Sequence, residues 1–185
     1  MPRSLPLLLL GMACLACAGL LGDHRLHDAA DIGDAAAVRA LIAEGVDLDA
    51  PDTRTHPTLG VVIGDTALRE AAASGHLPVV RLLVDAGADP DLADDFGWTP
   101  LLSAAQEEHT DCALVLLDGG ADPNLRNQVQ RSALHYAARD GDQKLIRRLL
   151  EHGAEVGVRD DDGNRPVDLA EANDHDDIVR RLKRR

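Results

Sequence analysis

Short apolar stripes at helical spacing alternate with glycine-containing turns along most of the chain. In the first unit of this kind, Val38, Leu41 and Ile42 fall on one face of a helix, which is the spacing of an amphipathic helix that packs on a core. The pattern recurs at a constant step, as one leucine of three successive units shows: Leu68, Leu101 and Leu134. A fixed period of roughly 33 residues indicates stacked pairs of helices, none of which buries its apolar face alone.

The stretch from Asp94 to Asn127 shows the unit most clearly. It contains Gly97-Trp98-Thr99-Pro100-Leu101, then Ala104-Ala105, and it closes with Leu116-Leu117-Asp118-Gly119-Gly120-Ala121-Asp122-Pro123-Asn124. This pattern resembles the ankyrin repeat. The resemblance extends over residues 24–185 and implies an all-α ankyrin-repeat solenoid of about five helix-turn-helix units with projecting β-turn fingers. The units are expected over residues 25–52, 64–94, 95–127, 128–160 and 161–185.

The period breaks once, between the first unit and the second. The step from Leu26 to Leu68 is longer than the regular step from Leu68 to Leu101, so a segment is inserted here. The insertion is expected at about residues 51–63, where the resemblance places a finger, and it contains an apolar β-branched run that favours extended structure. Two interpretations are open: the loop contacts a partner, or it folds back and shields the first unit.

Three helix positions indicate which side chains are buried and where the stack is capped. One position is alanine in the first four units and becomes Glu171 in the fifth, and another is apolar in the first four and becomes Lys183. Polar residues there indicate a face that no further unit covers. A third position keeps its leucine in every unit and is expected to be fully buried: Leu41, Leu83, Leu116, Leu149 and Leu182.

Two turn positions depart from the pattern. Glu108 stands where Gly75 and Gly141 stand, and Gln130 stands where Gly97 stands. If the backbone at Glu108 is left-handed, a residue other than glycine costs about 1 kcal/mol there.

The N-terminal segment, residues 1–22, differs in composition from the units. A short positive start precedes an uncharged apolar run over residues 5–21, and Ala16-Cys17-Ala18 offers a small-residue cleavage site. This order predicts a signal peptide over residues 1–18 and therefore an exported protein, which in a bacterium means the periplasm. Two alternatives are open: a lipoprotein leader that ends before Cys17, which would carry the lipid, and an uncleaved anchor.

The charge balance limits the class of partner. The chain carries 32 Asp and Glu against 19 Lys and Arg, a net charge of −13. Nucleic acid is not an expected partner, because binding a polyanion needs a basic footprint. An acidic surface favours a protein partner with a basic surface. We expect a monomer that reaches a membrane only through a lipid anchor. The basic residues of 180–185 either cap the last helix or contact anionic lipid or an acidic partner.

The histidines are spaced as structural residues. His76, His109 and His175 occupy one repeat position, and His27 and His135 occupy another. Residues in register along a stack lie about 10 Å apart, which is too far for shared zinc bonds of about 2 Å. For His27 and His135 the family resemblance implies hydrogen bonds to turn backbone. No metal site or cofactor is therefore expected.

The remaining candidates for chemistry are weak. Asp160-Asp161-Asp162-Gly163-Asn164 resembles the start of a calcium loop, but Arg165 stands where that loop needs glycine. Cys112 is the one cysteine beyond the leader and lies at an apolar helix position, so we expect a buried thiol and no internal disulfide. With no nucleophile or phosphate-loop motif, enzymatic activity is not expected.

The family resemblance places partner contacts on the finger tips and on the exposed face of the first helix of each unit. In this sequence those positions are Asp65, Ser74, Asp95, Phe96, Trp98, Gln106, Glu107, Gln128, Val129, Arg131, Arg139, Asp140, Asp161, Asp162 and Asn164. Phe96 and Trp98 gain weight because aromatic side chains often anchor interfaces. The alternative for Trp98 is a local one, in which its ring lies flat on the neighbouring finger.

Three hypotheses about function follow. The first is an exported binding module that recognises another protein through the concave finger and first-helix face, as an accessory factor or an inhibitor. The second is a structural envelope protein without a specific partner. The third, a metal-dependent hydrolase that uses histidines and carboxylates, has the least support because no motif for it is present.

Overall fold

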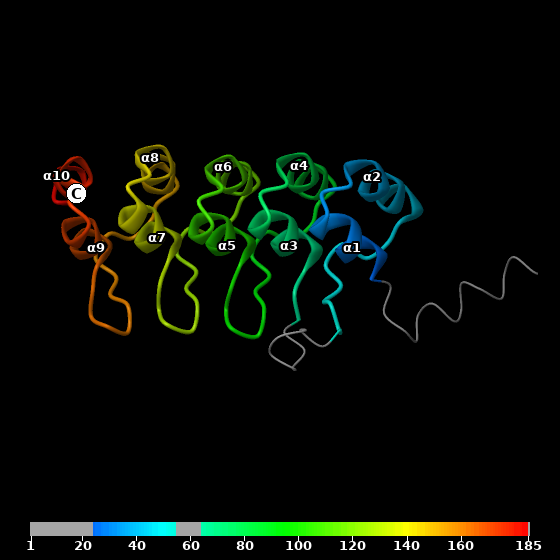
Figure 1. Ribbon diagram of the computed structural model, residues 1–185, viewed down its shortest axis with the longest axis horizontal. Coiled ribbons are helices and arrows are strands. Elements are labelled where there is room, and N and C mark those ends of the chain that lie inside the picture. The colour runs from blue at the N-terminus through cyan, green and yellow to red at the C-terminus, as the bar shows by residue number, and fades with distance from the viewer. Residues whose placement is uncertain (1–23, 55–63, 185) are drawn as a thin grey trace, which may run out of the picture.

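The computed structural model of the chain describes residues 24–54 and 64–184 (Figure 1). The predicted leader, with Cys17, and most of the predicted insertion lie outside these residues. The described part contains ten α-helices and no strand. In chain order they are α1 Arg25–Asp31, α2 Ala35–Glu44, α3 Ala67–Ala73, α4 Leu77–Asp85, α5 Pro100–Gln106, α6 Thr110–Asp118, α7 Ala133–Asp140, α8 Gln143–Glu151, α9 Pro166–Ala172 and α10 Asp176–Leu182.

The helices stack in series as two parallel rows (Figure 1). The odd-numbered helices contact one another in order from α1 to α9, and within each unit the odd helix packs on the even one. The turns between α4 and α5, α6 and α7, and α8 and α9 project together on the side away from the even row (Figure 1). The all-α repeat solenoid expected from the sequence is confirmed. None of the described helices has the length and apolarity to cross a membrane.

Side chains next to the helices set where they begin. The Thr66 hydroxyl accepts a hydrogen bond from Arg69 N, and the Thr99 hydroxyl accepts one from Leu102 N, both at 3.2 Å. These bonds satisfy backbone donors that the first turn leaves without a partner. Pro100 lies in the first turn of α5, where its missing N–H costs little.

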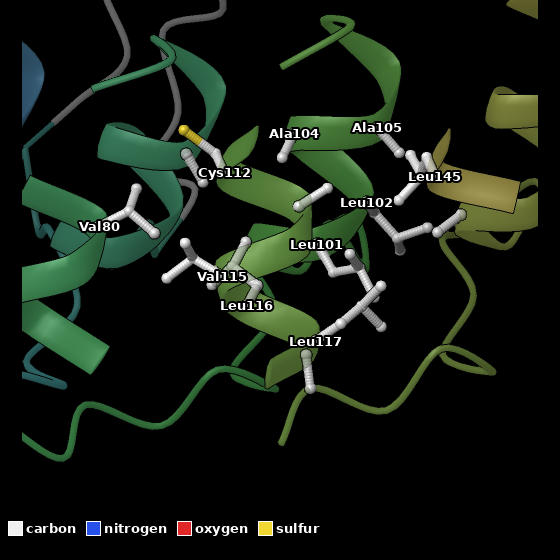
Figure 2. Close-up of a cluster of buried hydrophobic side chains, with 14 of the residues drawn as sticks. Val80, Leu101, Leu102, Ala104, Ala105, Cys112, Val115, Leu116, Leu117 and Leu145 are labelled. Carbon is white, nitrogen blue, oxygen red and sulfur yellow. The ribbon is translucent and has the colours of Figure 1, made fainter. Parts of the chain in front are cut away.

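The core is a continuous apolar layer between the two rows (Figure 2). Alanines such as Ala104 are fully buried and let the odd helices approach closely, while leucines such as Leu101 of α5 and Leu116 of α6 fill the space between the two rows. The repeated leucine position is buried in every unit, as predicted. Cys112 is also buried among these residues, which confirms its expected role as a small apolar side chain.

The capping positions of the fifth unit behave as predicted. Glu171 and Lys183 are exposed, whereas Ala138 and Leu150, which occupy these positions in the fourth unit, are buried. The ammonium of Lys183 pairs with the carboxylate of Glu171. The polar residues thus replace an apolar contact with an ion pair on the open end of the stack.

Three residues other than glycine have a left-handed backbone among those described. Glu108 has φ 60°, Gln130 has φ 59° and Asp174 has φ 61°. The first of these confirms the left-handed turn considered from the sequence. Asp174 occupies the same turn in the fifth unit as Glu108 does in the third, so the backbone geometry is kept even where the glycine is not.

Candidate functional site

Each described finger is a tight turn held by its own first side chain. In the finger 94–98, the Asp94 carboxylate accepts hydrogen bonds from Phe96 N and Trp98 N, both at 2.8 Å. The first residues of the fingers 127–131 and 160–164 also accept a bond from the backbone N–H four residues later. Burial raises the pKa of Asp94, although these N–H groups act in the opposite direction. The turns are therefore preformed.

The three fingers are also bonded to one another. Gln128 N donates to Phe96 O at 3.0 Å, and the Gln128 amide donates to Asp95 O at 2.7 Å. One finger further, Asp161 N donates to Val129 O at 3.2 Å. Such cross-links make the row of fingers one surface, in which each tip has a fixed position relative to the next.

Gly97 permits the close approach of the first two fingers. Its φ is 78°, and a Cβ at this position would lie 3.0 Å from the Cα of Asn127. Both the left-handed backbone and the contact with Asn127 backbone therefore require glycine.

Two apolar side chains lie exposed on adjacent fingers. Phe96 keeps 36% of its surface exposed and Val129 keeps 48%. Trp98 is half-buried, and its ring packs on Tyr136 of α7 with the centroids 5.5 Å apart. The Arg139 guanidinium lies 5.2 Å from the same tyrosine ring. Trp98 thus packs on the first helix of the next unit.

The cationic side chains of this surface are already paired. Arg131 Nε lies 2.9 Å from an Asp160 oxygen, and its NH2 group lies 3.2 Å from an Asp162 oxygen. Arg139 Nε lies 2.6 Å from an Asp140 oxygen. Since the arginines are neutralised locally, exposed carboxylates such as Asp95 and Asp161 give the surface its net negative character.

Most of the residues predicted as contacts are accessible. Those that the structure exposes are Ser74, Asp95, Phe96, Glu107, Gln128, Val129, Asp161 and Asp162. Those that it half-buries are Trp98, Gln106, Arg131, Arg139, Asp140 and Asn164. We use the term finger face for the exposed and half-buried side chains of the fingers 94–98, 127–131 and 160–164.

Asp65 is the one predicted partner contact that the structure buries. Its side chain is buried, with 7% of the residue exposed. Its carboxylate pairs with the Arg69 guanidinium, and its carbonyl accepts a hydrogen bond from Asp52 N at 2.6 Å. The residue directly precedes the capping Thr66, and its side chain reaches Arg69 in the first turn of α3. Asp65 therefore does not belong to the finger face.

Several histidines brace the backbone between units. His76 Nε2 lies 2.8 Å from Asp31 O, and His175 Nε2 lies 3.0 Å from Arg139 O. His135 Nδ1 accepts from Ser132 N at 3.1 Å, and its Nε2 donates to Asn164 O at 3.3 Å. Burial lowers the pKa of His135, which fits a neutral imidazole with the proton on Nε2.

His27 differs, because a carboxylate of the next unit faces it. Its Nδ1 lies 3.2 Å from a Glu70 oxygen, and Asp52 lies beside both. Sequence reasoning missed this group because it compared histidines only with histidines at the same repeat position. The separations along the chain, with the insertion between Asp52 and Glu70, gave no recognisable spacing.

Comparison with known proteins identifies the family. A family model described as ankyrin repeats, in three copies, matches residues 26–127 and again residues 119–184. No individual curated protein matches the chain. Together the two matched ranges extend over residues of all ten described helices and over the three fingers. The chain therefore belongs to the ankyrin-repeat family.

Proposed function

We propose that this chain is an exported ankyrin-repeat module that binds another protein through the finger face and the neighbouring first helices, as an accessory factor or an inhibitor. Ankyrin repeats are generally modules for protein–protein interaction and are typically not enzymes. The export half of the proposal rests on the composition of residues 1–18, and in a bacterium it implies the periplasm, with the protein free or lipid-anchored at Cys17.

The exposed pair Phe96 and Val129 carries the proposal. Large apolar side chains on projecting turns contribute nothing to the core, and these two lie on fingers that backbone hydrogen bonds hold together. A preformed surface loses little conformational entropy when a partner binds. Apolar anchors at the centre of a polar surface are the usual arrangement of a specific interface.

The charges around this pair favour a partner with a basic surface. Asp95 precedes Phe96, and Asp161 bonds to the backbone of Val129, and both carboxylates are exposed. The association rate should fall as salt is added, since electrostatic steering between exposed charges is screened beyond about 8 Å at physiological ionic strength.

Site-specific photo-cross-linking in the producing cell tests the proposed face. A photoreactive phenylalanine analogue is placed at Phe96, and in a matched control at Arg81, which is exposed on α4 in the even row. We expect a discrete adduct with one protein from position 96 and none from position 81. Adducts from position 81 alone would contradict the proposed face, and a smear of many products from both positions would favour an envelope protein without a specific partner.

Mass spectrometry of the protein isolated from cells tests the export half. A start directly after Ala18 is expected for a cleaved signal peptide, and a mass increase by diacylglycerol and an acyl chain on Cys17 for a lipoprotein. A protein found in the cytoplasm with the whole segment 1–18 still attached would contradict export.

A further inference from the structure

Three potential ligands of a metal ion meet where the first unit packs on the second. His27 comes from α1, Asp52 from the segment between α2 and α3, and Glu70 from α3. One donor atom from each of the three lies within 4.8 Å of the others. His27 is buried, and the side chains of Asp52 and Glu70 are only 12% and 16% exposed. The group therefore lies in a shielded position, unlike a chance meeting of surface charges.

The same three positions are occupied differently at every other junction. At the next junctions they hold Arg69, Asp94 and Ser103; then Leu102, Asn127 and Tyr136; then His135, Asp160 and Leu169. In the first of these sets Arg69 NH1 donates to the Ser103 hydroxyl at 3.3 Å, and in the second the Asn127 amide donates to the Tyr136 hydroxyl at 2.8 Å. In the third, Asp160 pairs with Arg131, which lies outside the set. Only the first junction combines an imidazole with two carboxylates.

The hydrogen bonds of His27 leave one ring nitrogen facing an acceptor. Nε2 lies 3.0 Å from Ala50 O, and because a carbonyl can only accept, Nε2 carries a proton. Nδ1 lies 3.2 Å from the Glu70 oxygen. In the free protein a proton between these two atoms makes this contact a hydrogen bond, and a metal ion that binds both atoms would take the place of that proton. Metal-binding histidines usually donate their other N–H to a carbonyl or carboxylate in this way.

The charges nearby are consistent with a divalent ion. Asp28, Asp52 and Glu70 are acidic, and the Arg54 guanidinium pairs with the first two of them. With neutral imidazoles, three carboxylates against one guanidinium leave two negative charges. Arg54 donates its backbone N–H, Nε and NH2 groups to the Asp52 carboxylate. These three donors leave one of the about four lone-pair sites of the carboxylate for a metal ion.

We propose that His27 Nδ1, Asp52 and Glu70 bind a divalent transition-metal ion of the zinc type that joins the first unit to the second. In a tetrahedral zinc site with bonds of about 2.0–2.1 Å, donor atoms lie about 3.3 Å apart. The distance between Nδ1 and the Glu70 oxygen, 3.2 Å, is already close to this separation. Mixed imidazole and carboxylate ligands favour zinc and its neighbours over calcium and magnesium, which prefer oxygen alone.

His24 is the nearest source of a fourth ligand. Its Nδ1 lies 3.2 Å from an Asp52 oxygen, and its ring centroid lies 6.3 Å from that of His27. Either this partly exposed ring or water would complete the coordination. The ion would thus link residues from three segments of the first junction and stabilise the terminal unit.

Zinc binding to the purified full chain tests the proposal. We expect one Zn²⁺ per chain by isothermal titration calorimetry, and a rise in Tm when Zn²⁺ is added to protein stripped with a chelator. Glu70→Gln and Asp52→Asn keep the side-chain shapes and should each weaken binding at least ten-fold and abolish the rise in Tm. His135→Gln is the matched control, because His135 occupies the position of His27 in the fourth unit without a carboxylate opposite Nδ1; it should leave binding unchanged.

Two results would overturn the site. One is wild-type protein whose Tm does not respond to Zn²⁺, as expected if a proton alone bridges His27 and Glu70. The other is an equal loss of binding in His135→Gln, which would indicate unspecific histidine contacts. Should Glu70→Gln fail to fold, Co²⁺ added to the wild type decides: intense visible absorption that Zn²⁺ removes supports a four-coordinate site, and the weak spectrum of hydrated Co²⁺ contradicts it.

Discussion

Replacing Leu116 by alanine tests whether the units are stacked as one cooperative structure. Leu116 lies in α6 and none of its surface is exposed. Its helix packs on α4, α5 and α8, so the side chain supports contacts to both neighbouring units. The change removes three carbon atoms, which at about 0.8 kcal/mol each corresponds to about 2.4 kcal/mol of lost burial. The cavity that remains raises the expected loss to about 3–4 kcal/mol.

Leu182→Ala is the matched control for this change. Leu182 holds the same repeat position in α10, is 5% exposed and belongs to the last unit. Since stability in a repeat array depends on each unit and its contacts with neighbours, this variant should fray the fifth unit and leave the main transition nearly unchanged.

Urea unfolding followed by far-ultraviolet circular dichroism measures both effects. The Leu116 variant should show a lower midpoint and a smaller m-value, because the units on its two sides unfold less cooperatively. A loss below about 1 kcal/mol for Leu116→Ala would refute the expected packing. Equal shifts of the main transition by both variants would refute the serial coupling of the units.

Three further changes test local features of the structure. Gly97→Ala should lower the Tm more than Gly163→Ala. Both glycines have a left-handed backbone, but only at Gly97 would a Cβ contact the next finger. An equal loss of Tm in both variants would show that the finger contact is not tight. Glu108→Gly should raise the free energy of unfolding by about 0.5–1 kcal/mol, because glycine adopts the φ of 60° without strain. Glu107→Gly, at φ −88°, should give no such gain. A lower free energy of unfolding in the Glu108 variant would contradict the strain. Burial raises the pKa of the Cys112 thiol to about 11, so Ellman's reagent at pH 8 should label it only after unfolding in urea; rapid labelling of the folded chain would contradict its burial.

The features that could be predicted from the sequence are those that recur in every unit. The buried leucines, and the polar residues Glu171 and Lys183 on the open face of the last unit, follow from comparison of one unit with the next, because every unit buries the same helix positions against its neighbours. The repeat position of Asp65 suggests a partner contact, but its carboxylate is buried in an ion pair with Arg69, which comparison of the units does not reveal. The group of His27, Asp52 and Glu70 could not be found by comparison of units, because it occurs once and joins three segments at the junction where the period breaks.

The central claim is that this protein works by presenting a preformed finger face to another protein. Hydrogen–deuterium exchange of the chain, alone and with the protein captured through position 96, tests it most directly. The account predicts that the partner slows exchange at the fingers 94–98, 127–131 and 160–164, and leaves α4, α6 and α8 unchanged. Protection confined to these even-numbered helices, with the fingers exchanging as in the free chain, would contradict it.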